Sequence, residues 1–256
     1  MRHLGGDNVF KYSTYDRALS LSDLATYADR IKTNCLETGN ILKQDGDTGD
    51  FITWEQVEDI RNFLIDRQKT IINMNTEVPY YNLEFHKELL KRAVLIGIKY
   101  IQPMMDNSIA TDSFRQEAFF ALCSVARAYN IGVLVENKEN ECAVDHYFEE
   151  LFKKELQVKP KFIFNPAEFV KVDAHPFFHR FYRSRLKNDI IILRINDCLF
   201  KTKKQVLPGK GNSEIKEMAS ILLARSFDGW FSIGSYGQGI DPEDVISHFK
   251  ESLKHM

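Results

Sequence analysis

The sequence has little of what marks secreted, membrane-spanning or DNA-binding proteins. Its four cysteines are scattered without CxxC spacing, which favours free thiols in a cytoplasmic protein. No apolar run is long enough to span a membrane, and the first residues lack the apolar core expected of a signal peptide. Lys and Arg number 34 against 36 Asp and Glu, a net charge of -2, so the overall charge does not favour nucleic acid as a partner.

The chain also lacks any proline-, glycine- or serine-rich linker and any low-complexity tract. With 256 residues, 44% of them hydrophobic, it can bury one large core. Barrels of alternating strands and helices commonly reach this size as a single domain. We therefore expect residues 1–256 to form one domain.

Short apolar strands alternate with amphipathic helical segments along the whole chain, which is typical of a parallel sheet built from βα units. The strand candidates recur about every thirty residues, the spacing of a (β/α)8 barrel of ordinary size. The first candidate is more polar than a barrel core prefers. The candidates are Val9–Tyr12, Arg30–Leu36, Thr70–Asn75, Tyr100–Pro103, Gly132–Glu136, Lys161–Asn165, Ile190–Ile195 and Gly229–Ile233.

The intervening helices have start and stop signals. Ser22 is the expected N-cap of the first helix, and Thr53 followed by Gln56 is expected to begin the second. Gly97 is expected to end the third helix. The remaining helical patterns cover Leu83–Ile96, Ser113–Tyr129, Cys142–Glu155 and Asn212–Ser226.

Four motifs follow one another in the C-terminal half. They are ARAYNIGVLVEN (126–137), FIFNPAEFV (162–170), ILRIND (192–197), and LPGKG (207–211) followed by FDGWFSI (227–233). In order and spacing they resemble the xylose isomerase-like TIM barrels, which comprise sugar isomerases and epimerases together with the DNA-repair enzyme endonuclease IV. The resemblance implies an α/β fold, a single (β/α)8 barrel, with the ligand site at the C-terminal mouth.

The resemblance also implies a metal site, but this sequence departs from it. In the family, each of the last four strands contributes one ligand to the ion, and these ligands are Glu, Asp, His and Glu in that order. The matching residues here are Glu136, Asn165, Arg194 and Gly234. Asparagine lacks the charge, glycine lacks a side chain, and a guanidinium has no lone pair to donate. We therefore predict that the metal site has been lost and that the protein has no metal cofactor.

The sequence leaves two possible roles for Arg194 open. In the first, it forms a structural ion pair with Glu136 inside the barrel mouth. In the second, it binds a carboxylate, phosphate or enolate oxygen of a substrate and takes over the electrostatic role of the metal. An exposed position fits poorly, because Arg194 lies within the apolar segment ILRI.

Other polar residues near the predicted strand ends are candidates for the same site. Glu168 is a candidate catalytic base beside Glu136 and Arg194, although a carboxylate in a loop is commonly only solvated. Thiol or metal chemistry at Cys35, Cys198 or the pair His175 and His179 is less favoured than packing. The candidates for substrate contact are Asn165, Asp197, Lys210, Gln102 and Glu37, with Asn75 and Asp106 also at strand ends.

Two classes of function follow. The protein is either an isomerase or epimerase acting on a sugar, sugar phosphate or sugar acid, or a catalytically inactive protein that binds a carbohydrate or another protein. Isomerisation needs a base beside a carbonyl and a positive group for the enolate. Because Gly234 removes one family carboxylate, a second base would come from Glu37 or Asp106. DNA repair is disfavoured by the missing ligands and the net charge, and a homodimer is expected from the resemblance alone.

Overall fold

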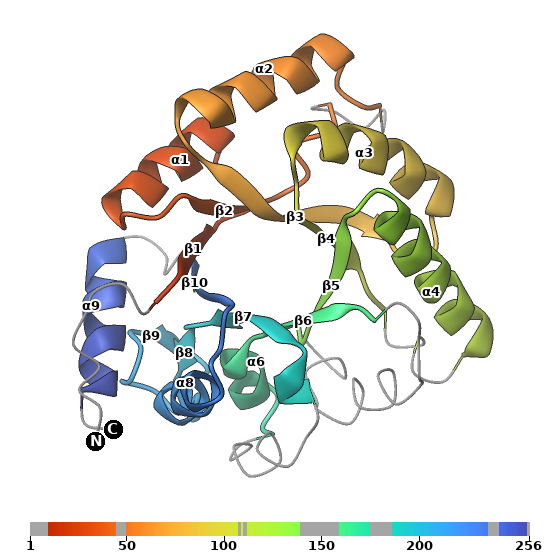
Figure 1. Cartoon of the computed structure of the whole chain (residues 1–256). Helices are drawn as coiled ribbons and strands as arrows, with labels where there is room; N and C mark the ends of the chain where they lie inside the picture. The colour runs from red at the N-terminus through yellow and green to blue at the C-terminus, as the bar shows by residue number, and fades with distance from the viewer. Residues whose placement is uncertain are drawn as a thin grey trace.

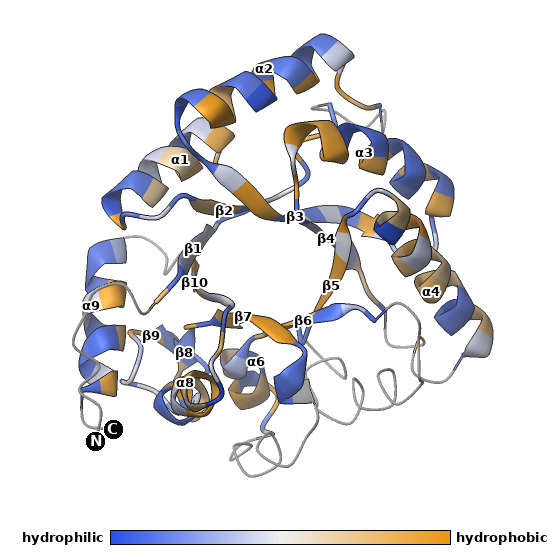
Figure 2. Ribbon diagram, in the orientation of Figure 1, coloured by the Kyte–Doolittle hydropathy of each residue, from blue (hydrophilic) through white to orange (hydrophobic). Residues whose placement is uncertain are grey.

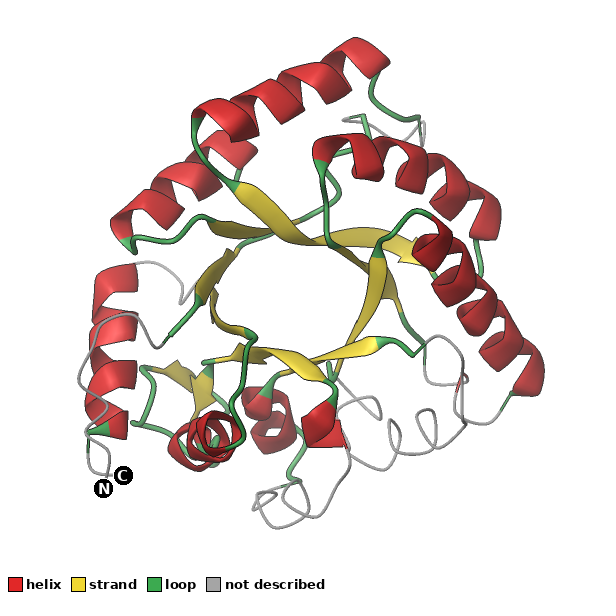
Figure 3. Ribbon diagram, in the orientation of Figure 1, coloured by secondary structure: helices red, strands yellow, loops and turns green. Residues whose placement is uncertain are grey.

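The computed structural model describes residues 10–44, 50–106, 109, 112–138, 159–174, 186–234 and 241–254. Within these ranges the strands form a closed barrel in the order β1-β10-β7-β6-β5-β4-β3-β2, and every neighbouring pair is parallel. The helices surround the ring of strands (Figures 1 and 3). The fold is the (β/α)8 barrel that the sequence predicts. Its strands are β1 (Tyr12–Tyr15), β2 (Cys35–Thr38), β3 (Thr70–Pro79), β4 (Tyr100–Met104), β5 (Gly132–Glu136), β6 (Lys161–Phe164), β7 (Ile190–Arg194) and β10 (Trp230–Gly234).

The helices carry hydrophilic and hydrophobic residues interspersed along their ribbons (Figure 2), as expected when one face packs on a sheet and the other meets water. The main core lies between the helices and the outer face of the barrel. No described helix is long and apolar enough to cross a membrane. The helices are α1 (Leu21–Arg30), α2 (Trp54–Asp66), α3 (Leu83–Ile96), α4 (Ser113–Ala128), α6 (Pro166–Lys171), α8 (Ile215–Ala224) and α9 (Pro242–Leu253), with a short 3-10 turn at Leu186–Asn188.

Several predicted helix signals are confirmed. Thr53 and Gln56 form a capping box at the start of α2, and α3 has the predicted bounds. Gly97 ends α3 in the left-handed conformation, with φ at 85°. The N-cap of α1 is Ser20 rather than Ser22, because the Ser20 hydroxyl accepts the Asp23 N–H.

Other boundaries differ from the prediction. The first strand lies later than expected, at Tyr12–Tyr15, and Val9 lies outside the described residues. Arg30 belongs to α1, so the second strand begins only at Cys35. Helix α9 was not predicted, and the helix predicted at Cys142–Glu155 lies outside the described residues.

A small hairpin follows β7. Its strands β8 (Asp197–Cys198) and β9 (Gln205–Val206) pair antiparallel to each other. The LPGKG loop comes directly after β9 and leads to α8. This hairpin and loop stand at the C-terminal end of β7, on the side of the barrel where binding residues of this architecture lie.

Candidate functional site

Strand alternation decides which side chains enter the barrel. Along β7, Leu193 packs in the outer core, while Ile192 belongs to a separate inner layer with Ile72, Leu134 and Ile163. Because successive side chains on a strand point to opposite faces, Arg194 enters the barrel two residues beyond Ile192. Its side chain lies above this apolar layer, toward the C-terminal mouth.

The Arg194 guanidinium is completely buried and binds two carboxylates. Its Nε donates to Glu136 Oε1 at 3.1 Å and its Nη2 to Glu136 Oε2 at 3.3 Å. Its Nη1 donates to Glu37 Oε2 at 2.8 Å and to Ser232 Oγ at 2.6 Å. Arg194 is thus bidentate to one carboxylate and bridges to a second on the other side of the barrel.

Tyr15 packs on the same guanidinium. The Arg194 Cζ lies 3.9 Å from the centre of the Tyr15 ring, a cation–π contact in a desolvated setting. Burial raises the pKa of Tyr15 to about 12, so its hydroxyl is neutral at ordinary pH. Tyr15 thus contributes a neutral aromatic ring to the buried guanidinium at the centre of the barrel.

Hydrogen bonds extend this arrangement around the whole ring. Gln102 donates to Glu136 Oε2 at 3.0 Å, and Asn165 donates to Glu136 Oε1 at 3.3 Å. Ser13 and Ser232 both donate to Glu37 Oε1, at 2.8 and 2.6 Å. We call the whole set the Arg194 cluster: Ser13, Tyr15, Glu37, Asn73, Gln102, Glu136, Asn165, Arg194 and Ser232.

The charges of the cluster are strongly coupled. Burial alone would raise the pKa of Glu136, but the Arg194 charge and hydrogen bonds, with the Gln102 amide, hold it below its ordinary value. Burial alone would lower the pKa of Arg194, but Glu136 and Glu37 raise it above its ordinary value. Glu136 and Arg194 are therefore both ionised in the folded protein at neutral pH.

Comparison with known proteins agrees with this architecture. No protein-family model matches the sequence, and no curated protein sequence matches it. Solved structures match over nearly the whole chain. A xylose isomerase domain-containing protein from Salmonella typhimurium has a TM-score of 0.70 at 16% identity, covering 98% of this chain and 99% of that one. The fold is that of the xylose isomerase-like TIM barrels.

Neighbours with this fold have different activities. A D-psicose 3-epimerase solved in the presence of D-fructose has a TM-score of 0.63 at 11% identity, covering 96% of each chain. Endonuclease IV from Thermus thermophilus has a TM-score of 0.62 at 13% identity, covering 96% of this chain and 99% of that one. At these identities the likeness establishes the fold, and the chemistry depends on the residues present.

The four positions of the metal ligands in xylose isomerase-like barrels do not suit an ion here. Asn165 and Arg194 both donate hydrogen bonds to Glu136, whose two oxygens are thereby engaged. A divalent cation at Glu136 would lie beside a permanent positive charge about 3 Å from the same carboxylate. Within the described ranges there is no group of three or more His, Cys, Asp or Glu side chains placed to hold a metal.

Asp197 holds the loop of the LPGKG motif. Its Oδ2 accepts the N–H groups of Gly209 and Gly211 at 2.9 and 2.8 Å, and its Oδ1 accepts those of Cys198 and Ser213 at 2.8 and 3.0 Å. Gly209 has a φ of 80°, and a Cβ on Gly211 would collide with the Asp197 carboxylate. Both glycines are thus needed for the backbone to wrap around Asp197, which acts as a structural anchor of the loop.

The remaining predicted residues lie around this centre rather than in it. Glu168 is a buried residue of α6 and pairs with Lys171 of the same helix at 2.7 Å. Lys210 is exposed at the tip of the LPGKG loop. Asn75 caps the Glu77 N–H at 2.9 Å, and Asp106 pairs with Arg115.

The structure describes the two cysteines that were weaker candidates but not the two histidines. Cys35 begins β2 and packs on the inner apolar layer, where its sulfur accepts the Trp230 indole N–H at 3.2 Å. It therefore lies toward the N-terminal end of the barrel rather than at the mouth. Burial raises the pKa of the Cys198 thiol, which makes it a poor nucleophile. His175 and His179 lie outside the described residues.

Five residues predicted from the sequence meet in one cluster: Glu37, Gln102, Glu136, Asn165 and Arg194. The other members of the cluster were not predicted: Ser13, Tyr15, Asn73 and Ser232. For three of them the signal was present, because Ser13, Tyr15 and Ser232 stand at inward positions of alternating strands. Asn73 directly follows the inward Ile72 at a register shift between β2 and β3, so alternation does not predict its direction.

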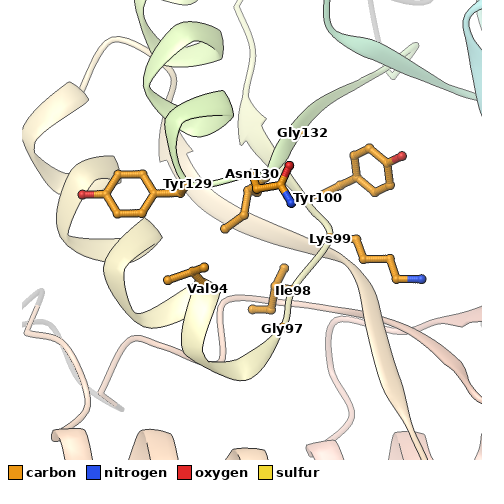
Figure 4. Close-up of a pocket in the computed structure, with 9 residues that line it drawn as sticks. Val94, Gly97, Ile98, Lys99, Tyr100, Tyr129, Asn130 and Gly132 are labelled. Atoms are coloured by element: carbon orange, nitrogen blue, oxygen red, sulfur yellow. The ribbon is translucent and has the colours of Figure 1, made fainter.

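A separate hollow of about 440 Å³ opens at the opposite end of the barrel (Figure 4). It lies between the ends of α3 and α4 and the starts of β4 and β5, with Lys99, Tyr100 and Tyr129 among its lining residues. It has no acid–base pair, and barrel enzymes place their chemistry at the other end. We therefore take the mouth above the Arg194 cluster as the candidate functional site.

Proposed function

We propose that this protein binds a carbohydrate or an anionic sugar derivative at the C-terminal mouth of the barrel, without a metal ion and without catalysing isomerisation. The observation that carries the proposal is the complete burial of Arg194 between Glu136 and Glu37. The Arg194 cluster fills the centre of the barrel with hydrogen-bonded polar side chains. The ligand would contact the residues on the C-terminal side of this cluster.

The electrostatics of the cluster support binding over catalysis. A base that removes a proton beside a carbonyl works best with a pKa near the operating pH. The pKa of Glu136 is instead lowered, and its carboxylate is engaged by three donors. The charge of Arg194 is likewise neutralised by its two carboxylates, so little of it is available for an enolate oxygen.

A second candidate, a metal-independent isomerase or epimerase, rests on a different observation. Glu37 and Glu136 approach the guanidinium from β2 and β5, so the cluster contains two carboxylates on separate strands. Two opposed carboxylates are what a two-base epimerase requires. This candidate needs the ion pairs to open when substrate binds, with Arg194 then serving as the electrophile.

The first experiment measures metal content of the purified protein and its thermal stability with Mn²⁺ or Zn²⁺. We expect no bound ion and no thermal shift. A matched positive control is the triple variant Asn165→Asp, Arg194→His, Gly234→Glu, which restores the ligand types of the family; the nearest atom to a Cβ at Gly234 would be Asn196 Oδ1 at 3.4 Å. A stoichiometric ion in the wild type, lost in Glu136→Ala, would overturn the metal-free proposal.

The second experiment compares binding and turnover over one panel of sugars, sugar phosphates and sugar acids. Binding measured by calorimetry without conversion detected by NMR would support the binding protein. Conversion that is lost in Glu136→Gln would instead establish the isomerase. Size-exclusion chromatography with light scattering on the same sample tests the expected homodimer, and a DNA-binding assay tests the expectation that nucleic acid is not a partner.

A further inference from the structure

Arg17 provides a second guanidinium near the Arg194 cluster. It lies two residues beyond the end of β1, and its Cζ is 5.4 Å from the centre of the Tyr15 ring. The same ring stacks on Arg194. The charge of Arg17 is also close enough to Glu136 to help lower the pKa of that carboxyl. Because Arg17 follows the C-terminal end of a barrel strand, its side chain is at the mouth.

Arg17 differs from Arg194 in having no carboxylate partner among the described residues. Its Nε and Nη2 are buried, and within the described part of the chain neither donates a hydrogen bond. These two N–H groups lie side by side on one edge of the guanidinium and point the same way. That edge is the fork that binds the two oxygens of a carboxylate. A buried donor pair of this kind is costly to leave without an acceptor, so an anion that reaches it is bound strongly.

Polar groups of neighbouring strand ends are also unsatisfied. Asn165 is only 6% exposed, and its Nδ2 is held by Glu136, which leaves its Oδ1 without a donor in the described structure. Asn196 Oδ1, just beyond β7, is buried and lacks a partner among the described residues in the same way. Oxygens of this kind accept hydrogen bonds from hydroxyl groups. The mouth thus combines the anion-binding edge of Arg17 with two oxygens that can accept hydrogen bonds from hydroxyl groups.

The local charge favours a carboxylate over a phosphate. Arg17 and Arg194 carry two positive charges, and Glu37 and Glu136 carry two negative charges. A carboxylate adds one negative charge beside Arg17. A phosphate monoester adds nearly two near Glu136, with no further cation placed by these residues to balance it.

We propose that Arg17 anchors a carboxylate subsite at the barrel mouth and that the ligand is a polyhydroxylated acid, a sugar acid in chemical class. This inference rests on the proposed function and narrows it. Arg17 takes the anion-binding role that the sequence suggested for Arg194, because Arg194 is already satisfied inside the barrel. The hydroxyl groups of the ligand donate to the oxygens of Asn165 and Asn196.

Calorimetric titration with three matched probes tests the inference: D-gluconate, D-glucose and D-glucose 6-phosphate. We expect gluconate to bind more tightly than the other two. Arg17→Gln should weaken gluconate binding about ten- to hundredfold, the effect of losing a charge-assisted bidentate contact. Arg17→Lys should recover only part of the loss, because it keeps the charge but not the fork. Arg61→Gln, an exposed residue of α2, is the control and should change nothing.

Thermal denaturation without ligand gives a second readout. Since Arg17 has two unsatisfied buried donors, Arg17→Gln should unfold at the same temperature as the wild type or higher, whereas loss of a structural arginine would lower it. Glucose binding as tight as gluconate binding, with Arg17→Gln without effect, would overturn the carboxylate subsite and leave the carbohydrate-binding proposal intact. Preference for the phosphate would overturn the ligand class. Absence of binding by all three probes would count against the proposed function and the inference together.

Discussion

Arg194 Nη1 lies 2.8 Å from Glu37 Oε2, although the two residues are 157 positions apart in the sequence. They belong to β7 and β2, which are separated in the barrel by β10 and β1. The ion pair therefore crosses the place where the first and last strands of the barrel meet. One side chain thus links the N-terminal and the C-terminal strands of the barrel.

Removing the guanidinium should destabilise the barrel strongly. Arg194→Met leaves Glu37 and Glu136 buried and without their cation, and we expect a loss of about 3–5 kcal/mol in the free energy of unfolding. Urea denaturation followed by circular dichroism measures it. Adding Glu37→Gln and Glu136→Gln to the same variant should recover much of the loss, because the buried charges then disappear together. A loss below about 1 kcal/mol for Arg194→Met would contradict the buried ion-pair geometry.

Replacing Asp197 should loosen the LPGKG loop. Asp197→Asn turns one acceptor oxygen into a donor that faces backbone N–H groups, and we expect a loss of roughly 3 kcal/mol. Hydrogen exchange of the Gly209, Gly211 and Ser213 amides should become faster. Asp173→Asn is the control, since Asp173 is 69% exposed and pairs only at the surface with Lys203. Unchanged exchange at the three loop amides would show that Asp197 does not anchor them.

Acid should destabilise the protein through Glu136. Its pKa in the folded state is below the ordinary value of 4.5, so the unfolded state binds the proton more readily. The stabilisation is therefore complete above pH 4.5 and is lost as the pH falls through the lower folded pKa. Urea denaturation over this range should show a smaller pH dependence in Glu136→Gln than in the wild type. Equal slopes would mean that Glu136 is not held in its charged form.

His86 should add a second pH dependence at milder acidity. It is fully buried, with Nδ1 against the Asn82 carbonyl at 2.8 Å and Nε2 against the Thr76 hydroxyl at 3.2 Å. Burial lowers its pKa below 6.5, so stability is complete above pH 6.5 and declines as the pH falls toward the folded pKa. Denaturation midpoints of the wild type should fall over this range more than those of His86→Gln. NMR titration of the imidazole checks the pKa directly, and an ordinary value would refute the prediction.

Much of the fold could be predicted because it depends on local pattern. The bounds of α3 and the capping box of α2 follow from residues within one or two turns of each other. β1 was misplaced because KYSTY has no apolar signal, and its inward residues are polar members of the Arg194 cluster. Arg30 was assigned to a strand because neither side of the helix end has a glycine or proline. For β1 the deciding contacts are distant in the sequence.

By itself, the sequence determined the (β/α)8 barrel, because the alternation of strands and helices is a local pattern. The loss of a metal site, which the sequence suggests through the residues that stand at the expected ligand positions, stays a prediction. Only the tertiary structure decided which reading of Arg194 the geometry favours. It placed Glu37, Ser232 and Tyr15 around a guanidinium that comes from another part of the chain. It also showed that Arg17 lacks a partner among the described residues. Pairing of buried charges depends on which strands meet when the barrel closes, and no local pattern specifies that.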